Sequence, residues 1–220
     1  VNIMASPFQY PAGPMITLKD IEQSETDTCI YVISRQAGEG SDRKLKEDEY
    51  SLSGVEKENI ALCAASYGKF IVAVNVGSVF DLSFLDEIEG ISAVVYYAQQ
   101  GMEGGRAFAD LISGKEVPSA KTVDTWPKKY KDIPFAMDYS YLNGDVDEEY
   151  YREGIYVGYR YFDSYDVEPR YPFGYGLSYT TFSIEKESVE MIGTKVILCA
   201  NVTNTGADHA GREVVQLYAS

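Results

Sequence analysis

A glutamate between two glycines is the feature of this sequence best suited to proton transfer. Glu39 lies in the segment Gly38-Glu39-Gly40-Ser41-Asp42-Arg43, directly after a short apolar run. Glycine adopts positive φ without steric cost, so the backbone beside Glu39 can approach a bound partner closely. Asp42 and Arg43 are interpreted as an orienting ion pair rather than as catalysts. From these residues alone, a solvated loop whose acid does nothing remains the alternative.

The elements around this segment predict that it lies at the edge of a parallel sheet. Residues 29–34 (CIYVIS) form a short continuous apolar run, which is typical of a strand buried on both faces. Ser53 and Glu56 have the spacing of a capping box at the start of a helix. Behind them, an apolar stripe at helical spacing comprises Ile60, Cys63, Ala64 and Tyr67. Open α/β sheets bind ligands at the carboxyl ends of their strands, where the Glu39 segment begins.

The same alternation continues along the chain. Residues 70–74 and 91–97 are further apolar runs that predict strands, and residues 80–88 and 103–113 predict helices. Alternating strands and helices with short connections predict an α/β fold, with a mostly parallel sheet and helices on both faces. Beyond Phe182 the period changes to that of strands: residues 195–203 and 213–218 predict two strands around a turn at 204–206. These strands indicate an incomplete β-sandwich.

Two other segments are candidates for binding. Gly101-Met102-Glu103-Gly104-Gly105 lies at a strand-to-helix junction, but its spacing is not that of a dinucleotide or P-loop motif. A nucleotide-binding regulator is therefore the weaker alternative. Tyr156, Tyr159 and Tyr161 belong to an aromatic-rich tract that could stack on sugar rings, or could simply cover a sheet edge or a domain seam. A non-catalytic carbohydrate-binding or scaffolding module is the stronger alternative.

Composition restricts the partners. The 34 acidic residues outnumber the 19 basic ones, and the net charge of −15 disfavours nucleic acid and anionic membranes. Cys29, Cys63 and Cys199 cannot all pair with one another and are predicted to be small buried hydrophobes. With one histidine, His209, and no metal-ligand spacing, we expect neither a metal nor another cofactor. Free cysteines and an N-terminus unlike a signal peptide favour the cytoplasm.

Taken in order, several segments resemble glycoside hydrolase family 3. They are SRQAGEGSDRK, FIVAVNVGSVFDLSFL, QGMEGGRAFADLISGKEVPSAKTVDTWP, YREGIYVGYRYFD, YPFGYGLSYTTF and VTNTGADHAGREVVQLY. The resemblance covers residues 29–219. It implies a linker or arm at 1–20, the α/β sandwich domain of that family at 21–178, and an incomplete fibronectin-III-like domain at 179–220.

The resemblance also implies a function. Members of this family are typically retaining β-glycosidases, many of them β-glucosidases, that hold the sugar between a (β/α)8 barrel and the sandwich domain. The nucleophile is an aspartate of the barrel, which is absent from this sequence. The general acid/base is a glutamate of the sandwich domain, and Glu39 matches its place. The partners implied are a β-linked glucoside or related oligosaccharide and the barrel of the parent protein, and this chain alone is expected to be inactive.

Overall fold

The computed structural model describes residues 13–35, 43–138, 144–145 and 147–218. Of the five residues predicted to form the candidate site, Gly38, Glu39, Gly40 and Asp42 lie outside the described residues, and Arg43 lies within them. The chain divides into two compact units: Val1–Gly101 with Trp126–Arg170, and Met102–Thr125 with Tyr171–Ser220.

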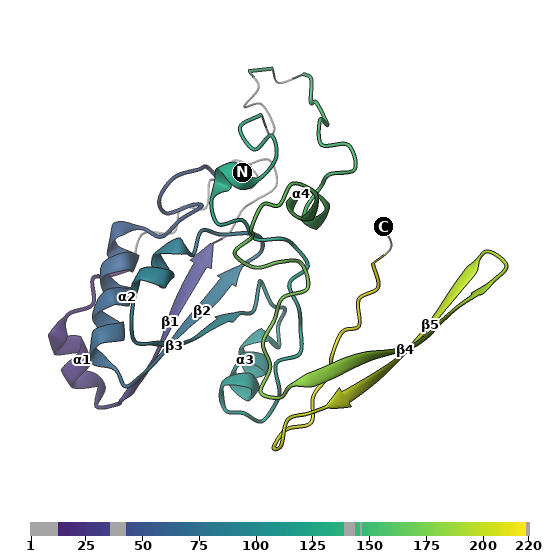
Figure 1. Cartoon of the computed structure of the whole chain (residues 1–220). Helices are drawn as coiled ribbons and strands as arrows, with labels where there is room; N and C mark the ends of the chain where they lie inside the picture. The colour runs from purple at the N-terminus through teal and green to yellow at the C-terminus, as the bar shows by residue number, and fades with distance from the viewer. Residues whose placement is uncertain (1–12, 36–42, 139–143, 146, 219–220) are drawn as a thin grey trace. The chain divides into compact units, whose positions relative to one another are not determined.

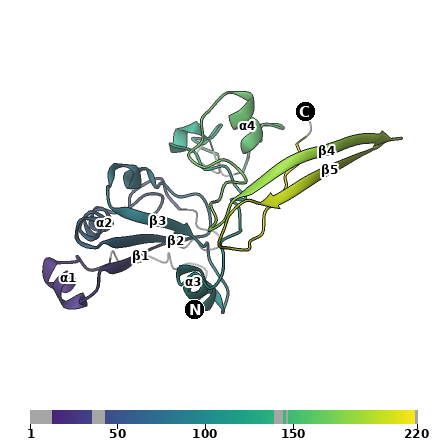
Figure 2. The same cartoon turned by 60° about the horizontal axis from the view of Figure 1, so that its bottom comes forward.

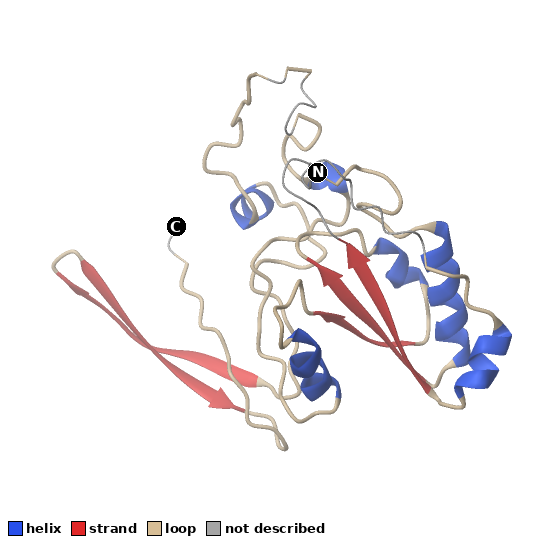
Figure 3. Ribbon diagram, turned by 180° about the vertical axis from the view of Figure 1, so that it is seen from behind, coloured by secondary structure: helices blue, strands red, loops and turns tan. Residues whose placement is uncertain are grey.

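The first unit is built on a three-stranded parallel sheet with the order β1-β2-β3 (Figures 1 and 3). Its strands are β1 (Thr28–Arg35), β2 (Lys69–Val76) and β3 (Ile91–Tyr96). The helical segments of this unit are α1 (Leu18–Ser24), α2 (Gly54–Ser66), the 3₁₀ turns η2 (Ser83–Glu87) and η3 (Tyr130–Asp132), and α4 (Tyr159–Ser164). The three predicted strands are confirmed, and the helix expected at 80–88 is the single 3₁₀ turn η2.

The core of this unit gathers around β2. Phe70, Val72, Ala73 and Val74 have no exposed surface, and β2 is the central strand, with a hydrogen-bonded neighbour on each side. The helix α2 packs beside the sheet and runs in roughly the same direction as β1 (Figure 1); Figure 2 shows it nearly end-on. The predicted apolar stripe supplies the contact, since Ile60, Cys63 and Ala64 of α2 are all buried. The continuous apolar runs thus correspond to parallel strands. Burial on both faces holds for β2 but is wrong for 29–34, because Ile30 and Val32 of β1 are 40% and 49% exposed, and Val94 of β3 is 40% exposed as well.

The capping box at the start of α2 is confirmed. The Ser53 hydroxyl accepts a hydrogen bond from the Glu56 N–H at 3.1 Å, and the Glu56 carboxylate accepts one from the Ser53 N–H at 2.8 Å. Together these bonds satisfy two backbone N–H groups at the start of α2. These groups have no carbonyl acceptor within the helix, because no turn precedes them. They fix where α2 begins, and therefore where its first turn lies relative to the end of β1.

The tight turn before β3 depends on a glycine. Gly90 has φ of +93°, and a Cβ at this position would lie 2.5 Å from the Ala64 carbonyl oxygen of α2. We expect Gly90→Ala to lower the free energy of unfolding by about 1–3 kcal/mol, because the substitution adds both backbone strain and a clash with main chain. Urea denaturation of the chain measures this. Gly54→Ala is the matched control, since a Cβ there meets nothing within 4 Å; an equal loss in both variants would contradict the prediction.

The second unit contains the helix α3 (Gly104–Ile112) and an antiparallel pair, β4 (Phe182–Ile192) with β5 (Lys195–Asn204). The strand predicted at 195–203 is confirmed as β5, and the helix predicted at 103–113 as α3. The hairpin turn, however, is formed by Gly193, with φ of +63°, and Thr194, rather than by residues 204–206. The chain is therefore α/β, with a parallel sheet and helices followed by a small antiparallel sheet.

The prediction of a strand at 213–218 is wrong. Its alternation of apolar and polar residues is strand-like, but the segment is extended without regular pairing to any described strand. A strand is defined by hydrogen bonds to a neighbour, which periodicity cannot supply. The partner of β5 is instead β4, whose sequence FSIEKESVEMI alternates less regularly.

Candidate active site

The segment 36–42, which carries Glu39, starts where β1 ends. Arg35 is the last residue of β1 and Arg43 is the first described residue beyond the segment. Because the three strands are parallel, their carboxyl ends lie at one edge of the sheet (Figure 1). This is the edge at which α/β sheets bind ligands, as the sequence predicts.

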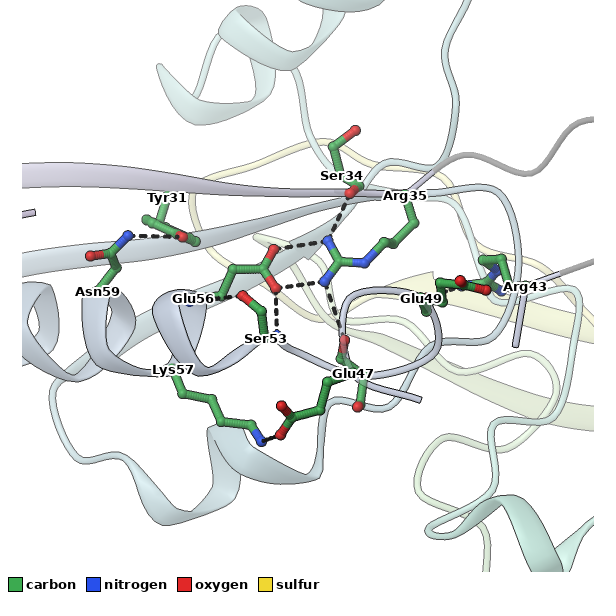
Figure 4. A network of polar contacts seen from close by, with 11 residues as sticks. Tyr31, Ser34, Arg35, Arg43, Glu47, Glu49, Ser53, Glu56, Lys57 and Asn59 are labelled. Carbon is green, nitrogen blue, oxygen red and sulfur yellow. Dashed lines mark hydrogen bonds and ion pairs between the residues drawn. The ribbon is translucent and has the colours of Figure 1, made fainter. Parts of the chain in front are cut away.

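Arg35 makes a buried ion pair with Glu56 (Figure 4). Its Nη1 and Nη2 donate to the two carboxylate oxygens of Glu56 at 2.8 and 2.5 Å, and only 9% of the arginine side chain is exposed. Nη1 also donates to the Ser34 carbonyl at 2.8 Å, and Nη2 to the Ser51 carbonyl at 3.2 Å. The guanidinium lies over the Phe80 ring, 4.9 Å from its centroid. Four residues thus fix the last side chain of β1: Glu56, Ser34, Ser51 and Phe80.

Glu56 therefore has two roles, of which the sequence indicated only the capping box. Burial by itself raises the pKa of its carboxyl. The hydrogen bonds from the Arg35 guanidinium and from the Ser53 N–H outweigh burial, so the pKa lies below its usual value. A buried arginine at the end of a strand requires a counter-charge, and this requirement is the signal that could have identified the pair from the sequence.

Arg43 is attached to the segment that follows β2. Its Nη2 donates to the Ser78 hydroxyl at 2.5 Å and to the Val79 carbonyl at 2.7 Å, and its Nη1 reaches the Glu49 carbonyl at 3.4 Å. Burial lowers the pKa of the Arg43 guanidinium from its usual value. The predicted ion pair with Asp42 lies outside the described residues and stays a prediction. The contacts that are described connect Arg43 to neutral oxygens.

Gln99, which follows β3, makes a hydrogen bond at the same edge. Its Nε2 donates to the Arg35 carbonyl at 3.1 Å. The Gln99 side chain also lies close to Gly77: a Cβ at position 77 would be 2.7 Å from the Gln99 Oε1, which is closer than van der Waals contact. Hydrogen bonds thus connect the last residue of β1, Arg35, to Gln99 after β3, and Arg43 to Ser78 after β2.

An open pocket of about 240 Å³ lies beside this edge in the first unit. Its lining residues are Leu45, Lys46, Tyr50, Ser51, Asp81, Ser83, Lys128, Lys129 and Tyr130. Burial raises the pKa of Tyr50 to about 12, so its hydroxyl stays protonated at neutral pH. Typical small-molecule sites have volumes of about 300–1,000 Å³. The volume of this pocket lies just below that range.

The other sequence candidates lie in less suitable surroundings. Glu103 caps α3 without a side-chain hydrogen bond to the helix, and its carboxylate lies 4.0 Å from Arg106. Tyr156 and Tyr161 each pack against Tyr165, with ring centroids 5.3 and 4.9 Å apart. The Tyr159 ring faces the Arg160 guanidinium, 5.6 Å away. Tyr156 nevertheless keeps 38% of its surface exposed.

The cysteine prediction holds for one residue. Cys63 is buried, Cys29 is partly exposed and Cys199 is exposed on β5, so the expectation that Cys199 is buried is wrong. A strand of an antiparallel pair is buried only where another layer covers it. Among the described residues, no three His, Cys, Asp or Glu side chains form a group that could hold a metal ion. The described helices include none long and apolar enough to cross a membrane.

Comparison with known proteins identifies the family. Residues 17–159 match the glycosyl hydrolase family 3 C-terminal domain. A β-glucosidase of Ruminococcus albus is 40% identical over 211 residues, which cover 96% of this chain and 21% of that protein. Butyrivibrio fibrisolvens β-glucosidase A is 34% identical and is matched over 31% of its length. The chain thus spans about a fifth to a third of these relatives.

Solved structures agree with this assignment. The structure of β-glucosidase 3B from Thermotoga neapolitana in complex with glucose superposes with a TM-score of 0.81 at 33% identity, covering 94% of this chain and 30% of that one. A β-glucosidase from Paenibacillus barengoltzii gives a TM-score of 0.80 at 34% identity, covering 89% of this chain and 22% of that one. The shared fold and the match over most of the first unit place this chain in the glycosyl hydrolase family 3 C-terminal domain family.

Proposed function

We propose that this chain is the part of a retaining β-glucosidase that supplies the general acid/base, Glu39, to a site completed by a (β/α)8 barrel. The observation that carries the proposal is the arrangement of Arg35 and Arg43. Arg35 and Arg43 are the described residues on either side of segment 36–42, and hydrogen bonds fix both of their side chains near the carboxyl ends of the strands. Two further findings support it: the relatives are β-glucosidases, and this chain matches only a fraction of their length.

The chemistry requires two carboxyl groups about 5–5.5 Å apart. In the first step, an aspartate of the barrel attacks the anomeric carbon while the bond to the leaving oxygen breaks, and Glu39 gives its proton to that oxygen. In the second step, Glu39 takes a proton from water as the water oxygen attacks the anomeric carbon and the bond to aspartate breaks. Glu39 must therefore be protonated at the start, which requires a raised pKa in the assembled site.

β-Linked glucosides are the proposed substrate. The glucose bound in the structure of β-glucosidase 3B supports this choice. The acidic surface of the present chain carries no electrostatic penalty against a neutral sugar.

The proposal predicts that activity depends on joining the chain to a barrel. We expect the purified chain of 220 residues to hydrolyse no aryl β-glucoside and to show no saturable binding of glucose, because it contains only one side of the site. When the chain replaces the matching 30% of β-glucosidase 3B, the chimera should hydrolyse the same substrate. Release of the coloured phenol measures both, and circular dichroism checks that both proteins are folded.

Two results would contradict the proposal. Hydrolysis by the isolated chain would show that it holds a complete site. An inactive chimera that is folded would show that the chain does not supply the missing group. Saturable sugar binding by the isolated chain, without activity in the chimera, would support the carbohydrate-binding module instead.

A further inference from the structure

We propose that an exposed apolar surface of the first unit is the surface on which the (β/α)8 barrel of the parent protein packs. This inference rests on the proposed function, because the partner that it names is the barrel that would complete the site. The surface is formed by described residues of two segments, 135–138 and 147–157, both in the first unit. The side chains that make up this apolar surface are Phe135, Met137, Tyr150, Tyr151, Ile155 and Val157.

The side chains of the apolar surface are unusually exposed for their size. Tyr151 is 89% exposed, Ile155 is 70% exposed and Met137 is 62% exposed, and the other three are exposed to between 46% and 58%. Single exposed apolar residues are common on proteins, whereas several large ones in neighbouring positions mark a surface that another protein or domain covers. The exposure therefore indicates a partner.

Contacts of Arg152 hold the two segments of this surface together. The Arg152 guanidinium donates to the Asp138 carboxylate at 2.6 Å. It also lies 5.9 Å from the centroid of the Phe135 ring and 5.7 Å from that of the Tyr150 ring, within the range of cation–π contacts. The surface is therefore formed within the chain itself, and a partner that packs on it has less side-chain order to impose.

The apolar surface lies on the side of the sheet where the strands end. Segment 147–157 leads into α4, and Figures 1 and 3 show this part of the first unit beyond the carboxyl ends of β1 and β2. The helix α1 instead precedes β1 and lies at the amino end of that strand. A barrel packed on the apolar surface would therefore lie next to the edge at which α/β sheets bind ligands, as a shared site requires.

The length of the relatives supplies a partner for this surface. The chain covers 30% of β-glucosidase 3B and 21% of the Ruminococcus albus enzyme, so most of each relative lies outside the region that this chain matches. A domain of the same polypeptide is present at high effective concentration and needs no separate encounter. A surface of this size and position is therefore best explained by a domain of the parent protein.

Charge argues against a second copy of this chain as the partner. Asp145, Asp147, Glu148 and Glu149 are all exposed beside the apolar surface, and the Tyr150 hydroxyl donates a hydrogen bond to the Glu148 carboxylate. In a two-fold symmetric dimer the same patch meets itself, so these acids would face identical acids and repel them. The partner that fits carries apolar side chains at its centre and lysine or arginine around them.

Hydroxyl-radical footprinting of the isolated chain and of the chimera with β-glucosidase 3B tests the surface directly. We expect Tyr150 and Tyr151 to be modified several-fold more slowly in the chimera, because the barrel excludes water from their rings. Leu18 of α1 is the control: it is 64% exposed and should react at the same rate in both proteins. Mass spectrometry of proteolytic peptides measures the rates.

Tyr151→Asp tests the same surface through activity, with two substrates. Phenyl β-glucoside has a poor leaving group that needs a proton, whereas 2,4-dinitrophenyl β-glucoside has a good one that needs none. We expect Tyr151→Asp to lower kcat/KM of the active chimera for both substrates alike, by about 10²-fold, because a displaced barrel misplaces the nucleophile that both need. Leu18→Asp, an equal change on α1, should leave both values unchanged.

The isolated chain separates loss of packing from loss of folding. Because Tyr151 is 89% exposed there, Tyr151→Asp should leave the melting temperature of the isolated chain unchanged. The footprint of the unsubstituted proteins needs no variant, so it decides the question even if the Tyr151→Asp chimera does not fold.

The outcomes distinguish this inference from the proposed function. Tyrosines that react equally in the chain and in an active chimera would show that the barrel packs elsewhere, and the proposed function would stand. A chimera that protects both tyrosines and hydrolyses neither substrate would support the surface and overturn the proposed function. If a rising concentration of the isolated chain protects the tyrosines, the surface binds a second copy; if added glucose protects them, it binds sugar. Either result would overturn the assignment to the barrel.

Discussion

Glu39→Ala is expected to lower kcat/KM of the active chimera for phenyl β-glucoside by about 10²–10⁴-fold, the usual contribution of a general acid/base. The dinitrophenyl glucoside needs no protonation, so its first step should be spared. Its second step should then become rate-limiting, because no base remains to activate water. A burst of dinitrophenol followed by slow turnover is the expected signature, and rapid-mixing absorbance measures it.

Azide makes the prediction specific. As an anion it attacks the anomeric carbon of the glycosyl-enzyme without giving up a proton, and the bond to the aspartate breaks with its electrons leaving on the carboxylate. We expect azide to accelerate the second step of Glu39→Ala and to yield β-glucosyl azide, the product with retained configuration. Nuclear magnetic resonance of the product identifies the anomer.

Two variants serve as controls for this experiment. Glu39→Gln keeps the shape of the side chain and should also accumulate the glycosyl-enzyme, because an amide cannot transfer the proton. Glu103→Ala removes another acid that has glycines beside it in the sequence, and it should leave both substrates unaffected. Rescue by azide at a different carboxylate, with no rescue at Glu39, would show that the assignment is wrong.

Glu56→Ala is expected to cause the largest loss of stability, about 3–5 kcal/mol in the free energy of unfolding. The substitution leaves the Arg35 guanidinium buried without its counter-charge, and it removes the second half of the capping box at Ser53. Urea denaturation of the isolated chain measures the effect. Glu58→Ala is the control, since Glu58 is exposed on the same helix and should change stability by less than about 0.5 kcal/mol.

The pH dependence provides a second check on Glu56. Its pKa is lower in the folded chain than in the unfolded one, so its contribution to stability is complete above the unfolded-state pKa. That contribution is lost as the pH falls through the lower, folded-state pKa, where the carboxyl becomes protonated in both states. The stability difference between the wild-type chain and Glu56→Gln should therefore shrink on acidification below the usual glutamate range. A difference that stays constant through that range would rule out the charged pair as its source.

Much of the first unit was predictable from the sequence because its signals are local. The runs at 29–34, 70–74 and 91–97 are β1, β2 and β3, and the capping box at Ser53 marks the start of α2. In each case the pattern is set by residues within a few positions of one another. The resemblance to glycoside hydrolase family 3 rests on ordered segments, and the match over residues 17–159 confirms it.

The second unit shows where local patterns fail. Residues 213–218 alternate like a strand and do not pair regularly with a described strand, whereas residues 182–192 alternate less regularly and form β4. Pairing depends on which segment offers a free row of backbone donors and acceptors, and this information is spread along the chain. The exposure of Cys199 was likewise not predictable from a local pattern. A side chain on β5 is buried only if a distant part of the chain covers that strand.

The sequence by itself determined the order of the three parallel strands, the family and the candidate Glu39, because each of these is encoded in short patterns or in their succession. Only the tertiary structure decided how the residues on either side of that segment, Arg35 and Arg43, are held. The bonds from Arg35 to Glu56, from Arg43 to Ser78 and from Gln99 to Arg35 span 21, 35 and 64 positions. Contacts over such separations form only when parallel strands bring their carboxyl ends to one edge, and no local pattern records them.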